Sequence, residues 1–230
     1  MLKLEQAVIT QDNFSLRADL LIKPKTKYAV IGPSGAGKST LLGALCGFVA
    51  ITSGKLTWQG QDITEAAPGA RPMTMLFQDN NLFPHLSITQ NVGLGLRGDL
   101  RLTADERAKV ESALFRVGLA DMADRKPGSL SGGQQSRAAL ARVLVQARPL
   151  VLLDEPFAAL GPALRTEMLG LVQQLVTETG ASLIMVTHDP KDVAQIADEV
   201  IFVANGTAHA PEPAQALMDN PPPELRAYLG

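Results

Sequence analysis

The chain has 230 residues, of which 46% are apolar and 19% are charged, and this balance excludes an intrinsically disordered chain. The net charge of −2 gives no electrostatic reason to expect a nucleic-acid partner. The single cysteine, Cys46, excludes an internal disulfide. No apolar run approaches the roughly 20 residues of a membrane-spanning helix, and the N-terminus lacks a signal-peptide core, so we expect a soluble, cytoplasmic protein.

The first predicted elements are strands. Leu2–Ile9 and Phe14–Ile22 carry apolar residues in partial alternation, with a turn at residues 11–13 between them. Tyr28–Ile31 is a short buried strand, and Lys55–Gly60 is a further strand that ends at a glycine. These segments predict antiparallel β structure in the first part of the chain.

A glycine-rich loop follows the Tyr28–Ile31 strand and precedes a run with helical spacing (Leu41, Leu42, Leu45 and Phe48). Glycines let successive backbone N–H groups point at one anion, and the following helix adds its positive N-terminal end. A lysine in this loop supplies a cation for phosphates, and the next hydroxyl is placed to bind Mg²⁺. The setting predicts a nucleoside-triphosphate site. Its residues are Gly32, Pro33, Ser34, Gly35, Ala36, Gly37, Lys38, Ser39 and Thr40, with Lys38 as the cation and Ser39 as the Mg²⁺ ligand.

The middle of the chain is predicted to be mostly helical, from residue 79 to residue 148. Thr103 and Glu106 form a capping-box pattern at one helix start, and a second helix is expected to begin near Ser131. The chain then returns to alternating strands and helices: strands at 150–153, 182–186 and 200–203, helices at 162–177 and 189–197, and a tail that allows only short helices.

Polar residues follow several of the predicted strands. Asp154 and Glu155 come directly after the buried strand at 150–153, Gln78 follows the strand at 73–77, and His188 follows the strand at 182–186. Ligands bind at the carboxyl edge of open parallel sheets, so Asp154 is suited to hold Mg²⁺ and Glu155 to activate water. A single His or Gln at a strand end usually has a structural role. Two such residues at the edge that also carries the two acids indicate a role at the γ-phosphate of the nucleotide.

The stretch Leu130-Ser131-Gly132-Gly133-Gln134 lies at a predicted helix start. A serine and two glycines before a helix can bind an anion. By itself, this stretch is more typical of an ordinary helix cap.

Taken together and in this order, the P-loop, Gln78, Leu130–Gln134, Asp154-Glu155 and His188 resemble the ATP-binding subunits of ABC transporters. The resemblance covers essentially the whole chain. It implies an α/β fold of the P-loop NTPase class, with a RecA-like core, an antiparallel β subdomain and an inserted α-helical subdomain. As a domain division, it implies one ATP-binding domain over 1–230, with the core and β subdomain in 1–78 and 149–230 and the helical subdomain in 79–148.

The resemblance also implies residue roles. Two subunits are expected to form a homodimer that sandwiches two ATP molecules, so that Ser131, Gly132, Gly133 and Gln134 contact the γ-phosphate in trans. Mg²⁺ is expected at Ser39, Asp154 and Gln78, with Glu155, His188 and Gln78 as the catalytic residues. Residues 80–86 are expected to receive a transmembrane permease. The subunit is then peripheral at the cytoplasmic face of the inner membrane, and a periplasmic solute-binding protein acts with it indirectly.

Within the family, Gly32–Leu42, Met75–Gln78 and Gln90–Leu96 resemble the subunits of thiamine importers most closely. Iron, molybdate or a polyamine are alternatives for the transported solute. A non-transport ATPase acting on DNA or ribosomes is a further alternative, but the chain has no coiled-coil arms, no basic surface and no second ATPase unit. Gly161 replaces an acidic residue that the family usually has, and Phe14 is the nearest candidate for a ring that stacks on adenine.

Overall fold

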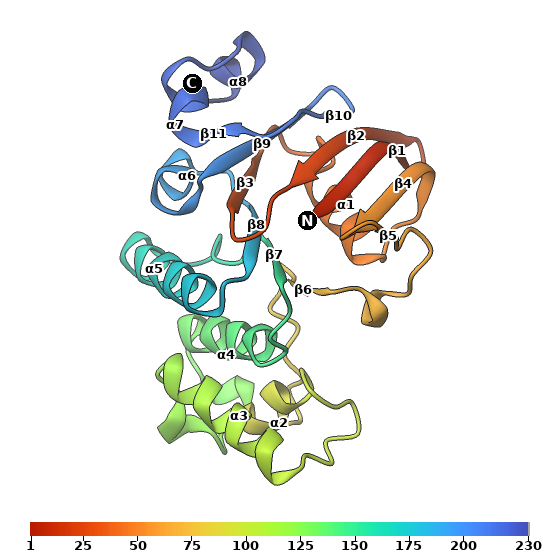
Figure 1. Cartoon of the computed structure of the whole chain (residues 1–230). Helices are drawn as coiled ribbons and strands as arrows, with labels where there is room; N and C mark the ends of the chain where they lie inside the picture. Colours follow the sequence, from red (N-terminus) through yellow and green to blue (C-terminus); the bar gives the residue numbers. More distant parts are fainter. Residues whose placement is uncertain (230) are drawn as a thin grey trace.

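The computed structural model describes residues 1–229, and its strands form one 11-stranded mixed sheet (Figure 1). The order of hydrogen-bonded strands is β5-β4-β1-β2-β10-β9-β3-β8-β7-β6, and β11 pairs with β9. The strands are β1 (Leu2–Gln11), β2 (Phe14–Ile22), β3 (Lys27–Ile31), β4 (Ile51–Trp58), β5 (Gln61–Asp62), β6 (Met73–Leu76), β7 (Leu150–Asp154), β8 (Ser182–Val186), β9 (Glu199–Ala204), β10 (Thr207–Ala208) and β11 (Glu212–Pro213).

The five strands β9, β3, β8, β7 and β6 run parallel to one another. All residues of β7 and β8 are buried, as expected for parallel strands with helices on both faces. Because parallel strands end at the same edge of a sheet, the residues after β3, β6, β7 and β8 meet there. This edge brings together the segments that the sequence singled out.

The antiparallel part consists of β1, β2, β4 and β5. In β2, buried and exposed residues alternate, because one face packs on the core and the other faces solvent. The two-residue strand β10 lies parallel to β2 and antiparallel to β9, so it joins the two parts into one sheet. The turn before β10 uses Asn205 (φ 49°) and Gly206 (φ 69°), the backbone geometry of a tight hairpin.

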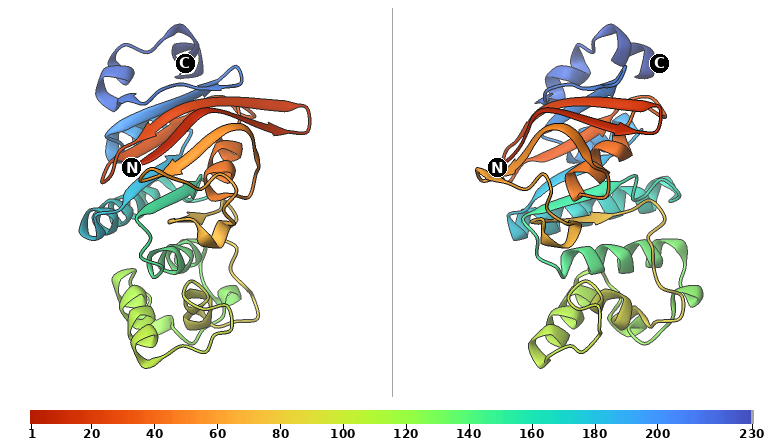
Figure 2. Two further views of the ribbon diagram at one scale, coloured as in Figure 1. Left: turned by 45° about the vertical axis from the view of Figure 1, so that its right-hand side comes forward. Right: turned by 90° about the vertical axis from the view of Figure 1, so that its right-hand side faces the viewer.

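The helices lie on both sides of the parallel strands and at the two ends of the molecule, with the C-terminal helices at one end and α2 and α3 at the other (Figure 2). Within residues 1–229, no helix combines the length and apolar character needed to cross a bilayer. The helices are α1 (Lys38–Cys46), α2 (Ile88–Gly93), α3 (Ala104–Arg116), α4 (Gly132–Leu144), α5 (Pro162–Thr179), α6 (Pro190–Ile196), α7 (Ala214–Asp219) and α8 (Pro223–Leu229), with 3-10 turns at Pro68–Ala70, Ala120–Met122 and Pro127–Ser129.

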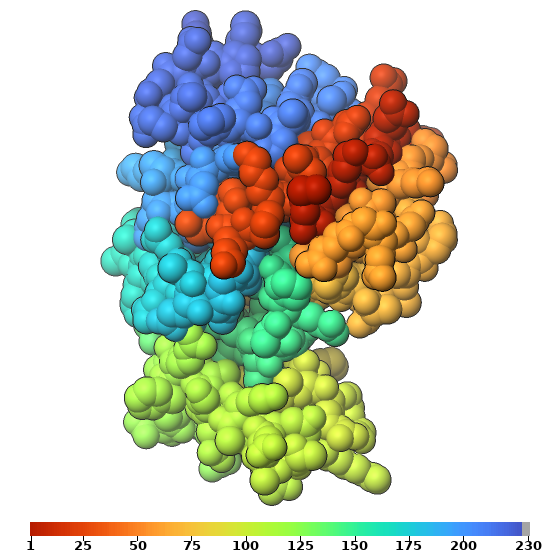
Figure 3. Space-filling model, viewed as in Figure 1, coloured from red at the N-terminus to blue at the C-terminus, as the bar shows by residue number. Residues whose placement is uncertain are grey.

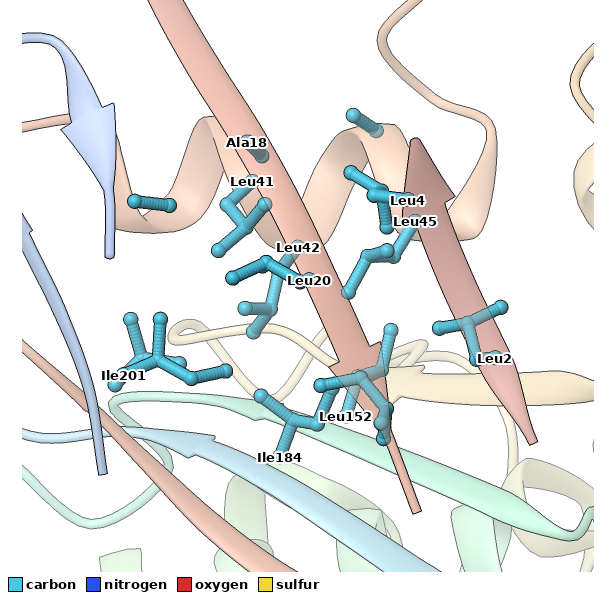
Figure 4. Close-up of a cluster of buried hydrophobic side chains, with 14 of the residues drawn as sticks. Leu2, Leu4, Ala18, Leu20, Leu41, Leu42, Leu45, Leu152, Ile184 and Ile201 are labelled. Atoms are coloured by element: carbon cyan, nitrogen blue, oxygen red, sulfur yellow. The ribbon is translucent and has the colours of Figure 1, made fainter. Parts of the chain in front are cut away.

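The largest hydrophobic cluster encloses α1, the helix that follows the glycine-rich loop. Leu41, Leu42 and Leu45 of α1 pack between Leu20 of β2 and Leu152 of β7, and all five side chains are buried (Figure 4). Burying one such leucine contributes about 1.5–3 kcal/mol, so this helix is held firmly between the two parts of the sheet. The phosphate-binding loop is therefore anchored to the hydrophobic core through α1.

A separate hydrophobic cluster joins α2, α3 and α4 in the helical region, the yellow-green lower end of the molecule in Figure 3. Val110, Leu114 and Val117 form its buried stripe on α3 and just beyond it, as their spacing predicts. Helix α4 has buried residues in this cluster and in the one under the parallel strands, for example Ala138 and Leu140. Helix α4 therefore connects the helical region to the sheet.

The structure confirms the predicted α/β class and most element positions. The Thr103–Glu106 capping box is present at the start of α3. Three two-residue strands, β5, β10 and β11, were not predicted. The prediction for Phe48 was wrong: α1 ends at Cys46, Gly47 terminates it with φ 86°, and the Phe48 side chain is 57% exposed.

Candidate active site

The glycine-rich loop connects β3 to α1 in a conformation that its glycines make possible. Gly32 has φ 150°, and a Cβ at this position would lie 2.0 Å from the Val203 carbonyl oxygen. Gly37 has φ 101°, and a Cβ there would lie 2.6 Å from Cζ of Phe14. The loop therefore passes close to β9 on one side and under the Phe14 ring on the other, and larger residues would displace it.

Lys38 is the first residue of α1 and is only 8% exposed. Its Nζ donates hydrogen bonds to the carbonyl oxygens of Gly32 and Pro33, each at 2.8 Å. Burial lowers the pKa of this ammonium, while the carboxylates of Glu155 and Asp154 act in the opposite direction. The cation is thus fixed within the loop, where it can contact the outer phosphates of a nucleotide.

Ser39 and Asp154 come together although 115 residues separate them: the Ser39 hydroxyl lies 3.1 Å from Oδ1 of Asp154. Asp154 ends β7 and is 8% exposed, and burial raises the pKa of its carboxyl, with the Ser39 hydrogen bond acting against the shift. A hydroxyl and a carboxylate are oxygen ligands of the kind that Mg²⁺ prefers. Within residues 1–229, no cluster of three or more His, Cys, Asp or Glu side chains forms a metal site.

Glu155 and His188 face each other at the ends of β7 and β8. Nδ1 of His188 lies 3.4 Å from Oε2 of Glu155, and the Glu155 side chain is 26% exposed. The Glu155 backbone has φ 44°, a conformation that is unusual for a residue other than glycine. Such strained positions occur at functional sites, because the surrounding structure must hold them.

A cavity of about 900 Å³, in the size range of small-molecule ligand sites, is lined by most of these groups, and Asp154 borders it only through its contact with Ser39. Residues of the glycine-rich loop line it together with Gln78, Glu155 and His188. The turn at 11–14, including the Phe14 ring, lines another part of the cavity. Phe14 also packs against the core, so it serves the cavity and the fold together.

Residues 131–134 are not among those that line this cavity. Ser131 caps α4: its hydroxyl accepts from the Gln134 N–H, and the Gln134 side chain accepts from the Ser131 N–H. Ser131 and Gly132 are exposed, so the helix start faces solvent. One chain therefore assembles all the other predicted site residues but leaves this motif apart from them.

The segment after Gln78 carries exposed apolar side chains. Phe83 is 46% exposed, and Phe48, from beyond α1, lies beside Phe77 with ring centroids 5.4 Å apart. Asn91 is fully buried and holds the segment by accepting from the Phe83 N–H at 2.7 Å. The sequence singled out 80–86 but missed Phe48, whose position directly after Gly47 was the available signal that it lies outside the helix.

Comparison with known proteins identifies the family. A model of the ABC transporter family matches residues 16–158. The chain is 56% identical to the thiamine import ATP-binding protein ThiQ of Cereibacter sphaeroides and 56% identical to that of Ruegeria sp. TM1040, over 100% of both chains in each case. It is 48% identical to the protein of the same name from Yersinia pseudotuberculosis, over 95% of this chain and 93% of that one.

The fold has a close structural counterpart. A nucleotide-free ATP-binding cassette from an ABC transporter superposes with a TM-score of 0.88 at 21% identity, covering 100% of this chain and 98% of that one. The superposition shows the fold, and the sequence matches show the family. This chain belongs to the ABC transporter family, as one of its ATP-binding ATPase subunits.

Proposed function

We propose that this protein powers the import of thiamine by hydrolysing Mg²⁺-bound ATP beneath a membrane permease. The observation that carries the proposal is the pairing of Glu155 with His188, 3.4 Å apart, in the cavity that the phosphate-binding loop also lines. A carboxylate beside an imidazole at the phosphate end of a nucleotide cavity can activate water and hold the transferred phosphate.

In this scheme the loop residues 32–40 bind the phosphates, with Lys38 on the outer ones. Ser39, Asp154 and Gln78 would hold Mg²⁺, whose charge neutralises the phosphate oxygens. Glu155 orients and deprotonates the attacking water, and His188 contacts the γ-phosphate.

The test of hydrolysis is the Glu155→Gln variant, which keeps the shape of the side chain and removes the base. Turnover should fall by about 10²–10⁴-fold while ATP still binds. Glu111→Gln, at an exposed position on α3, is the matched control and should hydrolyse ATP at the wild-type rate. Wild-type turnover by Glu155→Gln would contradict the assignment of Glu155.

A second copy of the chain would complete each site. The exposed start of α4 presents backbone N–H groups and a serine hydroxyl, a suitable binding site for the γ-phosphate held by the partner. Residues 79–148, with their own hydrophobic cluster, would act as a helical subdomain that carries this motif. Glu155→Gln should dimerise with ATP in sedimentation experiments, and adding Ser131→Arg should keep it monomeric. Dimers of the double variant would contradict this arrangement.

The permease would dock at residues 80–86, where Phe83 is exposed, and at the exposed Phe48, whose ring lies beside that of the half-buried Phe77. A short amphipathic helix of the permease fits such a surface. Phe83→Asp should abolish co-purification with the permease and leave ATP binding intact. Phe115→Asp is the matched control, because Phe115 is 76% exposed on α3 and lies outside this surface. Co-purification of Phe83→Asp would refute the docking site.

Thiamine as the solute is supported by the names of the relatives at 56% identity. The subunit would lie at the cytoplasmic face of the inner membrane, attached through the permease, with a periplasmic binding protein delivering the solute. The test is ATP hydrolysis by the complex in proteoliposomes, with the binding protein loaded in turn with thiamine, iron, molybdate or a polyamine. Stimulation by thiamine alone supports the proposal, and stimulation by another solute in its place refutes it.

A further inference from the structure

One arginine of α5 contacts three residues of the segment that contains His188. Nη2 of Arg165 lies 2.5 Å from Oδ2 of Asp192 and 3.3 Å from the Thr187 hydroxyl, and its Nε lies 3.1 Å from the same Asp192 oxygen. Nη1 lies 3.6 Å from Oδ2 of Asp189. Thr187 and Asp189 are the two chain neighbours of His188, so one side chain holds both flanks of the histidine.

The Thr187 hydroxyl connects these contacts. It donates to Oδ2 of Asp192 at 2.6 Å and accepts from the backbone N–H of Asp189 at 3.2 Å. The Thr187 N–H donates to the Val30 carbonyl at 3.1 Å, which ties the end of β8 to β3 just before the phosphate-binding loop. The backbone on both sides of His188 is therefore fixed: that of Thr187 through its own N–H, and that of Asp189 through the Thr187 hydroxyl.

The network is buried, unlike most charged pairs on this protein. Thr187 is 2% exposed, and the side chains of Arg165 and Asp192 are 15% and 8% exposed. Leaving a buried charge without its partner costs folding free energy. Such a network therefore keeps one geometry. In contrast, the Arg116–Glu178 pair near the other end of α5 is 35% and 46% exposed.

Helix α5 also connects the two catalytic strand ends. It begins at Pro162, seven residues after Glu155, and the Arg165 N–H donates to the Gly161 carbonyl in its first turn. The side chain of the same residue reaches the segment of His188. The position of His188 is thereby linked to the segment that follows Glu155.

We infer that Arg165, Asp192 and Thr187 are positioning residues that set the location of His188 at the γ-phosphate and act on hydrolysis through that histidine. This inference rests on the proposed role of His188. None of the three lies in the phosphate-binding loop, so they should affect turnover and not ATP affinity. A displacement of about 1 Å at a catalytic group costs on the order of 10²-fold in rate.

The test compares a substitution at Thr187 that removes the hydroxyl with one that keeps it. Thr187→Val keeps the shape and removes the hydrogen bonds, and it should lower kcat by about 10–100-fold with the Kd for ATP changed by less than about threefold. Thr187→Ser keeps the hydroxyl, and its kcat should stay within about threefold of the wild-type value. Arg165→Lys, which loses the paired contacts to Asp192, should behave like Thr187→Val. Glu178→Gln is the control and should have wild-type kcat.

A double-mutant cycle with His188→Ala decides whether the network acts through the histidine. In the His188→Ala background, Thr187→Val should lower kcat by less than about threefold further, because its target is already absent. If the two losses multiply, Thr187 acts independently of His188 and the inference is overturned, while the role of His188 stands. If His188→Ala alone keeps wild-type kcat, the proposed role of His188 fails and the inference fails with it. A kcat loss in Thr187→Ser equal to that in Thr187→Val would also overturn it.

Discussion

Arg71 holds the end of the helix that carries the phosphate-binding loop, and replacing it should destabilise the fold strongly. The residue is 3% exposed, and its guanidinium donates to the carbonyl oxygens of Ala44 and Leu45 in the last turn of α1, each at 2.7 Å. It also donates to Thr64 and Ala66 at 2.8 and 2.9 Å. Arg71 therefore joins α1 to the segment that leads into β6.

The size of the effect follows from these contacts. Arg71→Met keeps the length of the side chain but deprives buried carbonyl groups of their donor, at about 1–3 kcal/mol for each group left unpaired. The cation also lies at the C-terminal end of α1, where its interaction with the helix dipole contributes roughly 0.3–1 kcal/mol. The Ala44 carbonyl retains the Gly47 N–H as a donor, so the buried Leu45 carbonyl counts in full and the part-buried carbonyls of Thr64 and Ala66 count at the lower end of this range. We expect a loss of about 3–5 kcal/mol, a large part of the 5–15 kcal/mol that stabilises a typical protein.

Urea unfolding followed by the fluorescence of Trp58, the single tryptophan, measures this loss. With an m-value near 3 kcal/mol/M, the midpoint of Arg71→Met should fall by roughly 1–1.7 M. Arg71→Lys keeps the charge and part of the hydrogen bonding, so its midpoint should lie between those of Arg71→Met and wild type. A loss below about 1 kcal/mol for Arg71→Met would refute the reasoning, because it would mean that the carbonyls find other partners.

Three further predictions concern the cavity and its surroundings. Burial raises the pKa of Asp154 above its unfolded value, so ionisation costs stability as the pH rises through the raised pKa. Asp154→Asn should therefore raise the Tm of the nucleotide-free protein at pH 8, with no gain below the unfolded value of 3.8; a lower Tm at pH 8 contradicts this. Gly161 is the N-cap residue of α5, offers no side-chain hydrogen bond there and has open space at its Cβ position, so Gly161→Asp should add about 0.3–1 kcal/mol of stability. It should also change the Hill coefficient of ATP hydrolysis, and an unchanged rate and coefficient would count against a role for this turn in coupling. Phe14→Ala should weaken ATP binding by about 5–100-fold in calorimetry, and an unchanged Kd would exclude Phe14 as the ring that contacts the base.

Local patterns made much of the fold and the candidate site predictable. The glycine-rich loop was predicted because its residue types, its spacing and the flanking strand and helix all specify one conformation. The capping boxes at Thr103 and Ser131 are present for the same reason, since each pairs a hydroxyl with a side chain three residues later. The convergence of Gln78, Glu155 and His188 followed from parallel strands ending at one edge.

Other features depend on contacts between distant segments, which no local pattern encodes. Arg71 has no motif around it, and its role appears only when α1 lies beside it. The network of Arg165, Thr187 and Asp192 joins two helices and a strand end, so its members are unremarkable in sequence. The two-residue strands β5, β10 and β11 are too short for period-2 alternation to show. Phe48 continued the apolar spacing of α1, but Gly47 ends the helix before it.

We propose that ATP hydrolysis, with Glu155 as the base, powers thiamine import. The uptake of thiamine by cells tests this proposal most directly. Labelled thiamine would be supplied to cells without another thiamine importer, whose own copy of this subunit is replaced by wild type or by Glu155→Gln. Immunoblots would establish equal amounts of both versions and of the permease. The account predicts uptake with wild type and none above background with Glu155→Gln. Equal uptake with both versions would contradict it.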